Sequence, residues 1–474
     1  MTPPSAPLEP GVTDAIPRAL LRLALPVLGS NILRVAYQWV DALWVRPLGV
    51  EATAAVTTSI FVMWFVYALN DVVAIGATAY VSQLLGAGQR RRAGVAAYKG
   101  LRASGLLGLL GTAAGLFAAP WVFGLMTPDP AMAATGASYL AVVLAAAPLP
   151  MMALTGESIM RAAGNTRTPL LIDLCAVGLN AVLDPFLIYG WGPFPRLGVA
   201  GAAWATVIAQ AVYVGCYLLL AARGHPALPL ARREEPAAGG GPPPVRIAGM
   251  ARVGIPAALI GMLFSVVYVA FTRSAAQFGA AAMAIVGIAN RIEAIQFVNS
   301  AAIGVAGAAL VGQNLGAGRP ERAVEVIRTG VRWNFWIAVP LSALLMTFPD
   351  VFIGLFTHDP DAHRLGVPYL RVVTACLLFS GVEIVTAESI MGSGHTAAIS
   401  WIFGTFSVLR IPLAFLVPRW TGSGVLGIAW VITLTCIARS LLILGWARRG
   451  TWKGGLGTQL HGRGPPPHDP SEVA

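Results

Sequence analysis

Three polar residues that could exchange a cation lie near the ends of two otherwise apolar segments. Asp41 lies five residues before Arg46, and Asp184 lies at a comparable depth in a second segment, roughly 8 Å inside the helix end. Asn180 precedes Asp184 by four residues, so the amide shares its helix face. Desolvation favours the neutral form of such acids, and a pair of them can bind and release a proton. The structural alternative is that the acids form ion pairs with Arg34 or Arg46, or hydrogen-bond within the helix bundle.

The segments that contain these residues have the composition of membrane spans. Hydrophobic residues make up 56% of the chain and charged residues only 11%, and the mean hydropathy is +0.71. A charge at bilayer depth costs about 2.5 to 3.5 kcal/mol, so each ionisable residue inside a span needs a specific reason. We therefore predict an all-α polytopic membrane protein with 12 transmembrane helices.

We expect six spans in each half of the chain, with boundaries uncertain by about four residues. The first six cover residues 17–45, 51–82, 93–124, 131–161, 168–190 and 197–222. The second six cover residues 247–276, 281–312, 322–356, 362–391, 397–419 and 424–447. Pro26, Pro148, Pro150, Pro256 and Pro340 are the candidate kink sites.

The two halves repeat one sequence pattern. Gln-Leu-Leu-Gly-Ala-Gly at residues 83–88 returns 230 positions later as Gln-Asn-Leu-Gly-Ala-Gly at residues 313–318. We interpret both Gly-Ala-Gly segments as turns. An even number of spans returns the chain to its starting side, so the two six-helix bundles share one orientation. They should be related by a pseudo-two-fold axis along the membrane normal, with a central cleft between them.

The repeat also bears on the acidic residues. Asp41 maps onto Phe271, and Asp184 in Val-Leu-Asp aligns with Arg410 in Val-Leu-Arg. The acidic pair therefore belongs to the first lobe alone. A purely structural role would more naturally recur in both lobes, whereas an ion-coupling site is needed only once, so the repeat favours ion coupling.

Composition and charge define the domain boundaries and the orientation. We expect an N-terminal tail (1–16), an N-lobe (17–222), a linker rich in Gly and Pro (223–246), a C-lobe (247–447) and a C-terminal tail (448–474). Twenty-two Lys and Arg residues fall on the side of the termini and six on the opposite side. Both termini should therefore be cytoplasmic, in the inner (plasma) membrane.

Several other functions are disfavoured. The net charge of +11 comes from arginines at helix ends on one face of a polytopic protein, so we expect no nucleic-acid partner. No phosphate-binding motif and no catalytic constellation of histidines is present, so we expect neither an enzyme nor a nucleotide-driven pump. The four cysteines form no C-x-x-C pair, and no cofactor is expected apart from a coupling ion, H+ or Na+.

The chain resembles the multidrug and toxic compound extrusion (MATE) transporters, and within them the DinF-like branch. The resemblance is carried by the Trp-Val-Asp-Ala-Leu-Trp-Val-Arg-Pro-Leu-Gly segment around Asp41, the Gly-Ala-Gly turns, Gly-Asn-Thr-Arg-Thr-Pro at 164–169, and residues 180–185 and 198–204. It implies that Asp41 and Asp184, with Asn180 beside them, couple transport to H+ or Na+. Ala42 stands where the family commonly has threonine, so we favour the proton over sodium bound at these three residues.

Further residues are candidates for the substrate cavity. Aromatic side chains suit flat organic cations, and the candidates are Tyr37, Trp44 and Trp64 in the first lobe with Tyr268 and Phe271 in the second. Glu293 is either an additional protonation or substrate contact, or the partner of an arginine such as Arg273. Glu-Ser-Ile-Met recurs at residues 157–160 and 388–391, which favours a shared architectural role for both glutamates.

These observations predict a secondary active multidrug exporter. It would exchange organic, mainly cationic or amphiphilic, compounds for protons or sodium by alternating access, surrounded by membrane lipids and functional as a monomer. The alternative is a lipid-linked oligosaccharide flippase with the same two lobes. A flippase would favour a more basic cavity than the acidic outer pocket expected here.

Overall fold

The computed structural model describes residues 10–126, 130–228, 230–234, 242–457 and 460. Helices of the first half are α1 (Pro10–Thr13), α2 (Ile16–Val45), η1 (Arg46–Leu48), α3 (Val50–Gly86), α4 (Arg90–Met126), α5 (Pro130–Ala145), α6 (Pro148–Ala162), α7 (Arg167–Tyr189) and α8 (Val199–Ala222). Helices of the second half are α9 (Ile247–Ala276), α10 (Ala280–Gly316), α11 (Pro320–Thr347), α12 (Pro349–Gly354), α13 (Pro360–Met391), α14 (Thr396–Trp420), α15 (Val425–Arg448) and η2 (Thr451–Gly454). The described residues contain no strand, so the all-α prediction is confirmed.

Most of the predicted spans are single long helices. Within the described ranges, ten helices are long and apolar enough to cross a membrane, or eleven when the pair α5 and α6 is counted as one span. That pair is bent by 54° before Pro148, one of the predicted kink sites. The remaining predicted span, α11, carries five charged residues among its first thirteen, so only its second half is strongly apolar.

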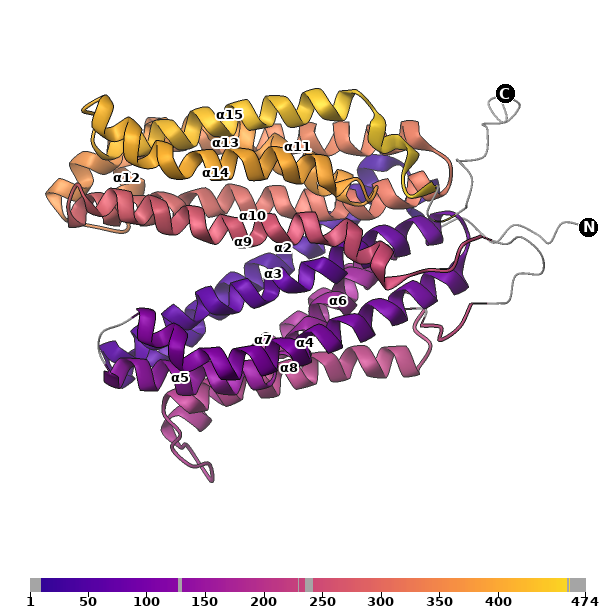
Figure 1. Ribbon diagram of the computed structural model, residues 1–474, viewed down its shortest axis with the longest axis horizontal. Helices are drawn as coiled ribbons and strands as arrows, with labels where there is room; N and C mark the ends of the chain where they lie inside the picture. The colour runs from indigo at the N-terminus through magenta and orange to yellow at the C-terminus, as the bar shows by residue number, and fades with distance from the viewer. Residues whose placement is uncertain (1–9, 127–129, 229, 235–241, 458–459, 461–474) are drawn as a thin grey trace, which may run out of the picture.

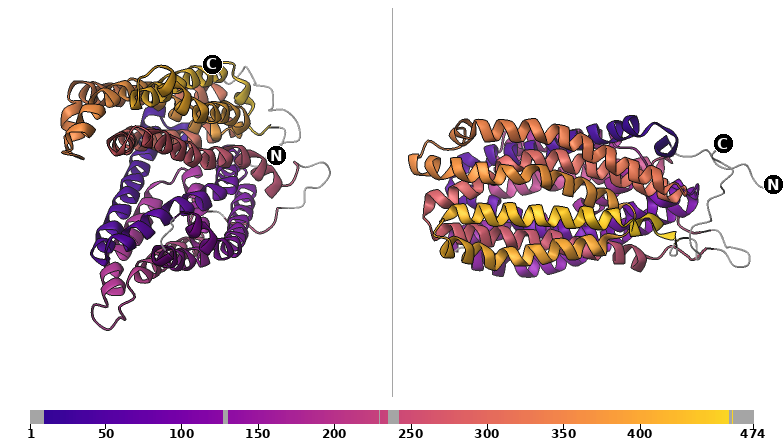
Figure 2. Two further views of the ribbon diagram at one scale, coloured as in Figure 1. Left: turned by 60° about the vertical axis from the view of Figure 1, so that its left-hand side comes forward. Right: turned by 90° about the horizontal axis from the view of Figure 1, so that it is seen from above.

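The helices form two groups that correspond to the two halves of the sequence. Figure 1 shows α3 to α8 below and α9 to α15 above, close together where α3 and α10 end and diverging toward the opposite end. The left view in Figure 2 shows the same two groups from another side, and the right view, from above, shows helices of the C-lobe in front, running along the long axis. We refer to the end that holds the Gly88 and Gly318 turns as the turn end, and to the opposite end as the far end. Helix α2 begins and α15 ends at the turn end.

The repeated motif folds identically in both lobes. Helices α3 and α10 each end at the same point, where Gly88 (φ 72°) and Gly318 (φ 71°) adopt left-handed conformations. The backbone N–H groups of Gln89 and Arg319 then donate to the carbonyl oxygens five residues earlier, at 2.8 Å in both copies. These bonds satisfy the last carbonyls of each helix, as in a Schellman motif. The prediction that both segments are turns is confirmed.

The lobes exchange their first helical turns. Ile16, Leu20 and Leu23 of α2 pack in a buried cluster with α10, α11 and α13 of the opposite lobe. In the same way, Met250 and Val253 of α9 pack in the main cluster of the N-lobe. Both α2 and α9 contain an internal proline directly after these turns, at Pro26 and Pro256. The turn end is therefore held together by apolar packing across the lobe boundary.

Candidate functional site

The predicted acidic pair lies inside the N-lobe, where α2, α7 and α8 face one another. Asp41 of α2 is 7% exposed, and Asp184 of α7 is completely buried. The two carboxyl groups are close enough to interact electrostatically. One oxygen of each, Oδ1, is buried without a hydrogen-bond partner in the described part of the chain. Buried carboxylate oxygens that lack a donor are rare, which points to a group that binds there in another state.

Asn180 lies beside this pair, as the four-residue spacing predicts. In the amide orientation that satisfies both of its polar groups, the Asn180 nitrogen donates to Asp184 Oδ2 at 3.3 Å and its oxygen accepts from the Thr206 backbone N–H at 3.3 Å. The Thr206 hydroxyl is 2.9 Å from the Tyr37 hydroxyl. Asp184 is therefore tied to α8 through an amide, and Tyr37 of α2 reaches the same helix.

Of the two structural alternatives for the acids, hydrogen bonding within the bundle occurs for Asp184, whereas an ion pair with an arginine is not found in the described structure. Arg34 contacts Glu157 at 2.5 Å and lies 3.8 Å from Asp173, and neither Asp41 nor Asp184 forms an ion pair in the described structure. Tyr213 donates to Asp173 at 2.6 Å. The charge of Arg34 is thus taken up by a separate, largely buried network, and no counter-charge of the acidic pair is found among the described side chains.

The predicted cavity aromatics occupy different environments. Tyr37 borders the acidic pair, and Tyr268 lies between Phe264 and Phe271 with ring centroids 4.7 and 6.1 Å away. Phe271 is only 2% exposed within the C-lobe core, so it faces no open space in this conformation.

Trp44 and Trp64 both come from the far half of the N-lobe. Trp44 contacts Tyr189 and Trp191 in an aromatic cluster, with ring centroids 6.3 and 6.1 Å apart. Trp64 belongs to α3, but its side chain is outside the part that the structure describes.

Glu293 in the C-lobe does not pair with Arg273. Arg273 is exposed near the end of α9, and the basic group that acts electrostatically on Glu293 is Arg410 of α14. Arg410 is 7% exposed and donates to the Thr435 hydroxyl at 2.7 Å. The C-lobe thus places a guanidinium at the position that corresponds to Asp184 in the repeat.

Glu383 forms a buried ion pair within the C-lobe. Its completely buried carboxylate forms an ion pair with Arg439, whose Nε lies 2.6 Å from Oε1, and its Oε2 accepts from the Ser440 hydroxyl at 2.9 Å. Arg439 also lies over the Phe403 ring, 4.1 Å from its centroid. The charge of Glu383 is therefore balanced within the lobe by Arg439, which points to a structural role.

Removing Arg439 should strongly destabilise the protein. Arg439→Ala leaves Glu383 buried without its counter-charge, which typically costs about 3 to 5 kcal/mol. We expect a clearly lower melting temperature in detergent, measured by size-exclusion chromatography after heating. Arg364→Ala is the matched control, because Arg364 and Asp361 form an exposed pair, and it should leave the melting temperature unchanged. Equal melting temperatures for both variants would contradict this assignment.

Sequence reasoning did not predict a reciprocal contact between the lobes at the turn end. Gln83 Nε2 donates to the carbonyl oxygen of Gly392 at 2.9 Å, and Gln313 Nε2 donates to that of Ala162 at 2.8 Å. Donors and acceptors are each 230 positions apart, so the two bonds are copies of one interaction. Both glutamines are at most 2% exposed. The sequence feature that could have indicated this contact is a glutamine that recurs at the same position of an apolar helix in both halves.

Glycines allow the backbones to approach at the same place. A Cβ atom at Gly86 would lie 2.0 Å from the carbonyl oxygen of Gln313, and one at Gly316 would lie 1.9 Å from that of Gln83. No side chain fits there without moving the opposite lobe. We call this set, Gln83, Gly86, Gln313 and Gly316, the lobe lock.

Segments that flank the lobes cover the lobe lock. Gln83 Oε1 accepts from the backbone N–H of Leu456 at 2.8 Å, and Leu456 and Leu460 are buried in the main N-lobe cluster. On the other side, Asn314 donates to the carbonyl oxygen of Gly11 at 3.2 Å. The C-terminal segment therefore extends from the C-lobe onto the N-lobe.

Comparison with known proteins agrees with the duplicated architecture. A family model described as MatE matches the chain twice, over residues 26–186 and 256–416. The chain is 27% identical over 443 residues to the probable multidrug resistance protein NorM of Thermotoga maritima, covering 92% of this chain and 93% of that protein. It is 26% identical over 404 residues to an FAD transporter of Shewanella oneidensis, covering 85% and 88%.

A solved structure shares the fold. The MOP superfamily transporter from Pyrococcus furiosus, whose report describes a binding pocket of reverse polarity, superimposes with a TM-score of 0.85 at 22% identity. The alignment covers 93% of this chain and 97% of that one. Together with the two matches of the family model, which span most of both lobes, this shows that the chain belongs to the MatE family and is a membrane transporter of the multidrug and toxic compound extrusion type.

Proposed function

We propose that the protein exports organic cations in exchange for protons that bind at Asp41 and Asp184. The observation that carries this proposal is the pair of buried carboxyl groups in one lobe, each of which, within the described part of the chain, has an oxygen without a donor and no ion pair with an arginine. A site with net negative charge and no fixed counter-charge must be neutralised by a mobile one. The assignment to the DinF-like branch and the preference for H+ over Na+ remain predictions.

The orientation follows from the distribution of basic residues. The turn end carries the large excess of Lys and Arg, so we place it and both termini in the cytoplasm. The far end, where the lobes diverge in Figure 1, then faces the outside. The conformation is therefore one in which the cytoplasmic side is closed by the lobe lock.

The residues of the site suggest how exchange proceeds. A proton that enters from the outside neutralises one carboxyl group of the pair, and the Asn180 amide holds Asp184 in place through its bond to Oδ2. Loss of the negative charge weakens the attraction for a bound cation, so substrate is released outward. Coupling requires that the proton bind the two facing states with different affinity.

The relatives named above leave the substrate open, because one is named for multidrug resistance and another for FAD. Two features favour organic cations here: the uncompensated acids of the N-lobe, and the half-buried Tyr268 beside the exposed Phe264 in the C-lobe. Aromatic faces attract cations and tolerate different shapes. A lipid-linked oligosaccharide is not favoured, since a pyrophosphate would meet these acids.

Transport in proteoliposomes tests the proposal. Purified protein would be reconstituted, and movement of ethidium would be followed by fluorescence under an imposed pH gradient, a sodium gradient, or neither. We expect the pH gradient alone to drive export. Transport driven only by sodium would move the coupling ion to Na+, and no movement of ethidium under either gradient would refute the organic-cation proposal.

A further inference from the structure

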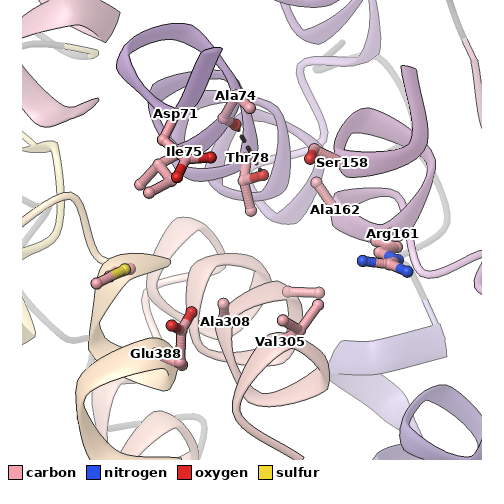
Figure 3. A pocket seen from close by; sticks show the side chains of 12 residues that line it. Asp71, Ala74, Ile75, Thr78, Ser158, Arg161, Ala162, Val305, Ala308 and Glu388 are labelled. Carbon is pink, nitrogen blue, oxygen red and sulfur yellow. Dashed lines mark hydrogen bonds between the residues drawn. The ribbon is translucent and has the colours of Figure 1, made fainter. Parts of the chain in front are cut away.

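A cavity of about 220 Å³ lies between the lobes, near the lobe lock. Its walls come from α3 and α6 of the N-lobe and from α10 and α13 of the C-lobe. Figure 3 shows Asp71 of α3 and Glu388 of α13 on opposite walls of this cavity. The two carboxyl groups therefore belong to different lobes and must separate when the lobes part at the turn end.

Neither carboxyl group has a hydrogen bond or an ion pair in the described structure. Arg161 is the one other ionisable residue of the described cavity wall, and it pairs with Glu157 of its own helix. The lining residues of α10 are Val305, Ala308 and Ala309, which carry no charge. From α9, which packs on α3, Arg252 acts on Tyr80, farther along α3 toward the turn end. Asp71 and Glu388 thus lack a dedicated counter-charge.

Comparison of the two repeats shows that the glutamate of the C-lobe lacks a counter-charge, whereas the corresponding glutamate of the N-lobe has one. Glu157 and Glu388 begin the two Glu-Ser-Ile-Met segments, but Glu157 is held by Arg34 and Arg161. Phe264 and Gly392 occupy the positions that correspond to these two arginines. The two glutamates therefore have different surroundings, and the prediction of one shared architectural role is wrong. Glu157 is neutralised within its lobe, whereas Glu388 faces the other lobe.

We propose that Asp71 and Glu388 form a charge-operated gate on the cytoplasmic side, completed by one positive charge from the cytoplasm. This charge is either a proton or the cationic group of a transported compound. The inference rests on the proposed function, because it assumes that the turn end opens to the cytoplasm. Two ionised carboxyl groups repel each other and lose hydration when the lobes close over them. A positive charge that binds between the two carboxyl groups offsets both the repulsion and the lost hydration, so the lobes close at the turn end once this charge is bound.

Distance measurements between the lobes test the gate without measuring transport. Spin labels would be attached at Ala222 and Arg448, the exposed ends of α8 and α15, in a variant without the native cysteines. We expect the separated population to grow as the pH rises from about 5.5 to about 8.5, and ethidium at high pH to restore the closed population. The double variant Asp71→Asn with Glu388→Gln should stay closed at both pH values.

Two controls isolate this pair of carboxyl groups. Glu325→Gln removes an exposed acid of α11 and should behave as the unsubstituted protein. The pH response should also persist when Asp41 and Asp184 are replaced by Asn, which separates the gate from the N-lobe acids. If Asp71→Asn with Glu388→Gln responds to pH and ethidium as the unsubstituted protein does, the gate proposal is refuted, whatever the transport assay shows.

Charge-reversal variants provide a second, independent test of the gate. Asp71→Lys alone, or Glu388→Lys alone, places opposite charges across the cavity and should hold the turn end closed at every pH. The double reversal restores like charges and should open it again. Identical distance distributions for the single and double reversals would overturn the proposal, because electrostatic sign would then have no effect on closure. Elution as a single folded species is checked for each variant beforehand.

Discussion

Asp184→Asn and Asp41→Asn should each reduce export driven by a pH gradient to the background of empty liposomes. Asparagine keeps the size of the side chain but cannot exchange a proton. Both native carboxyl groups are buried, and each has an oxygen that lacks a donor in the described structure, so each is available to bind the proton directly. The measurement is ethidium export from proteoliposomes under an imposed pH gradient, alongside equilibrium binding of ethidium.

A milder substitution distinguishes the role of the two acids from that of Asn180, which holds Asp184 in place. Asn180→Ala removes one hydrogen bond to a carboxyl group, worth about 1.5 to 3 kcal/mol, so coupling should weaken by about tenfold to a hundredfold without disappearing. Asp350→Asn, at an exposed carboxyl group far from the pocket, is the matched control and should transport normally. Undiminished pH-driven export by Asp184→Asn would falsify the assignment of the coupling site.

Local sequence properties were sufficient to predict the helices and the acidic pair. Predicted spans such as 247–276 agree with α9 because hydropathy over about 20 residues reports directly on burial in a bilayer. The four-residue spacing of Asn180 and Asp184 predicted that both lie on the same face of one helix, because a helix turns once every 3.6 residues. The 54° bend between α5 and α6 also followed from a local feature, the proline that starts α6.

Contacts between distant residues could not be predicted in this way. Arg34 pairs with Glu157 and not with Asp41, and this choice depends on where α2 and α6 lie in the folded N-lobe, which the sequence did not indicate. The burial of Phe271 and the exchange of the first turns of α2 and α9 likewise depend on packing between helices. Glu157 and Glu388 share a motif, yet their neighbours differ, so equal sequence did not mean equal surroundings.

The lobe lock should be abolished by a single methyl group. Gly86→Ala would place a Cβ atom 2.0 Å from the carbonyl oxygen of Gln313, and Gly316→Ala would place one 1.9 Å from that of Gln83. Both obstacles are backbone atoms, which cannot rotate away as a flexible side chain can. The lobes must therefore move apart at the turn end, and we expect ethidium export to fall to background for either variant.

Weakening of the helices would not explain this loss of export. Alanine favours a helix over glycine by about 0.8 to 1 kcal/mol, so neither substitution weakens α3 or α10 as a helix. Gly287→Ala, at a helical glycine of α10 with open space around its Cβ, is the matched control and should transport normally. The spin-label distance between the lobes should increase for Gly86→Ala and Gly316→Ala and remain unchanged for Gly287→Ala. Normal export by Gly86→Ala would mean that the transport cycle does not pass through the closed turn end seen here, because that closure has no room for the added carbon.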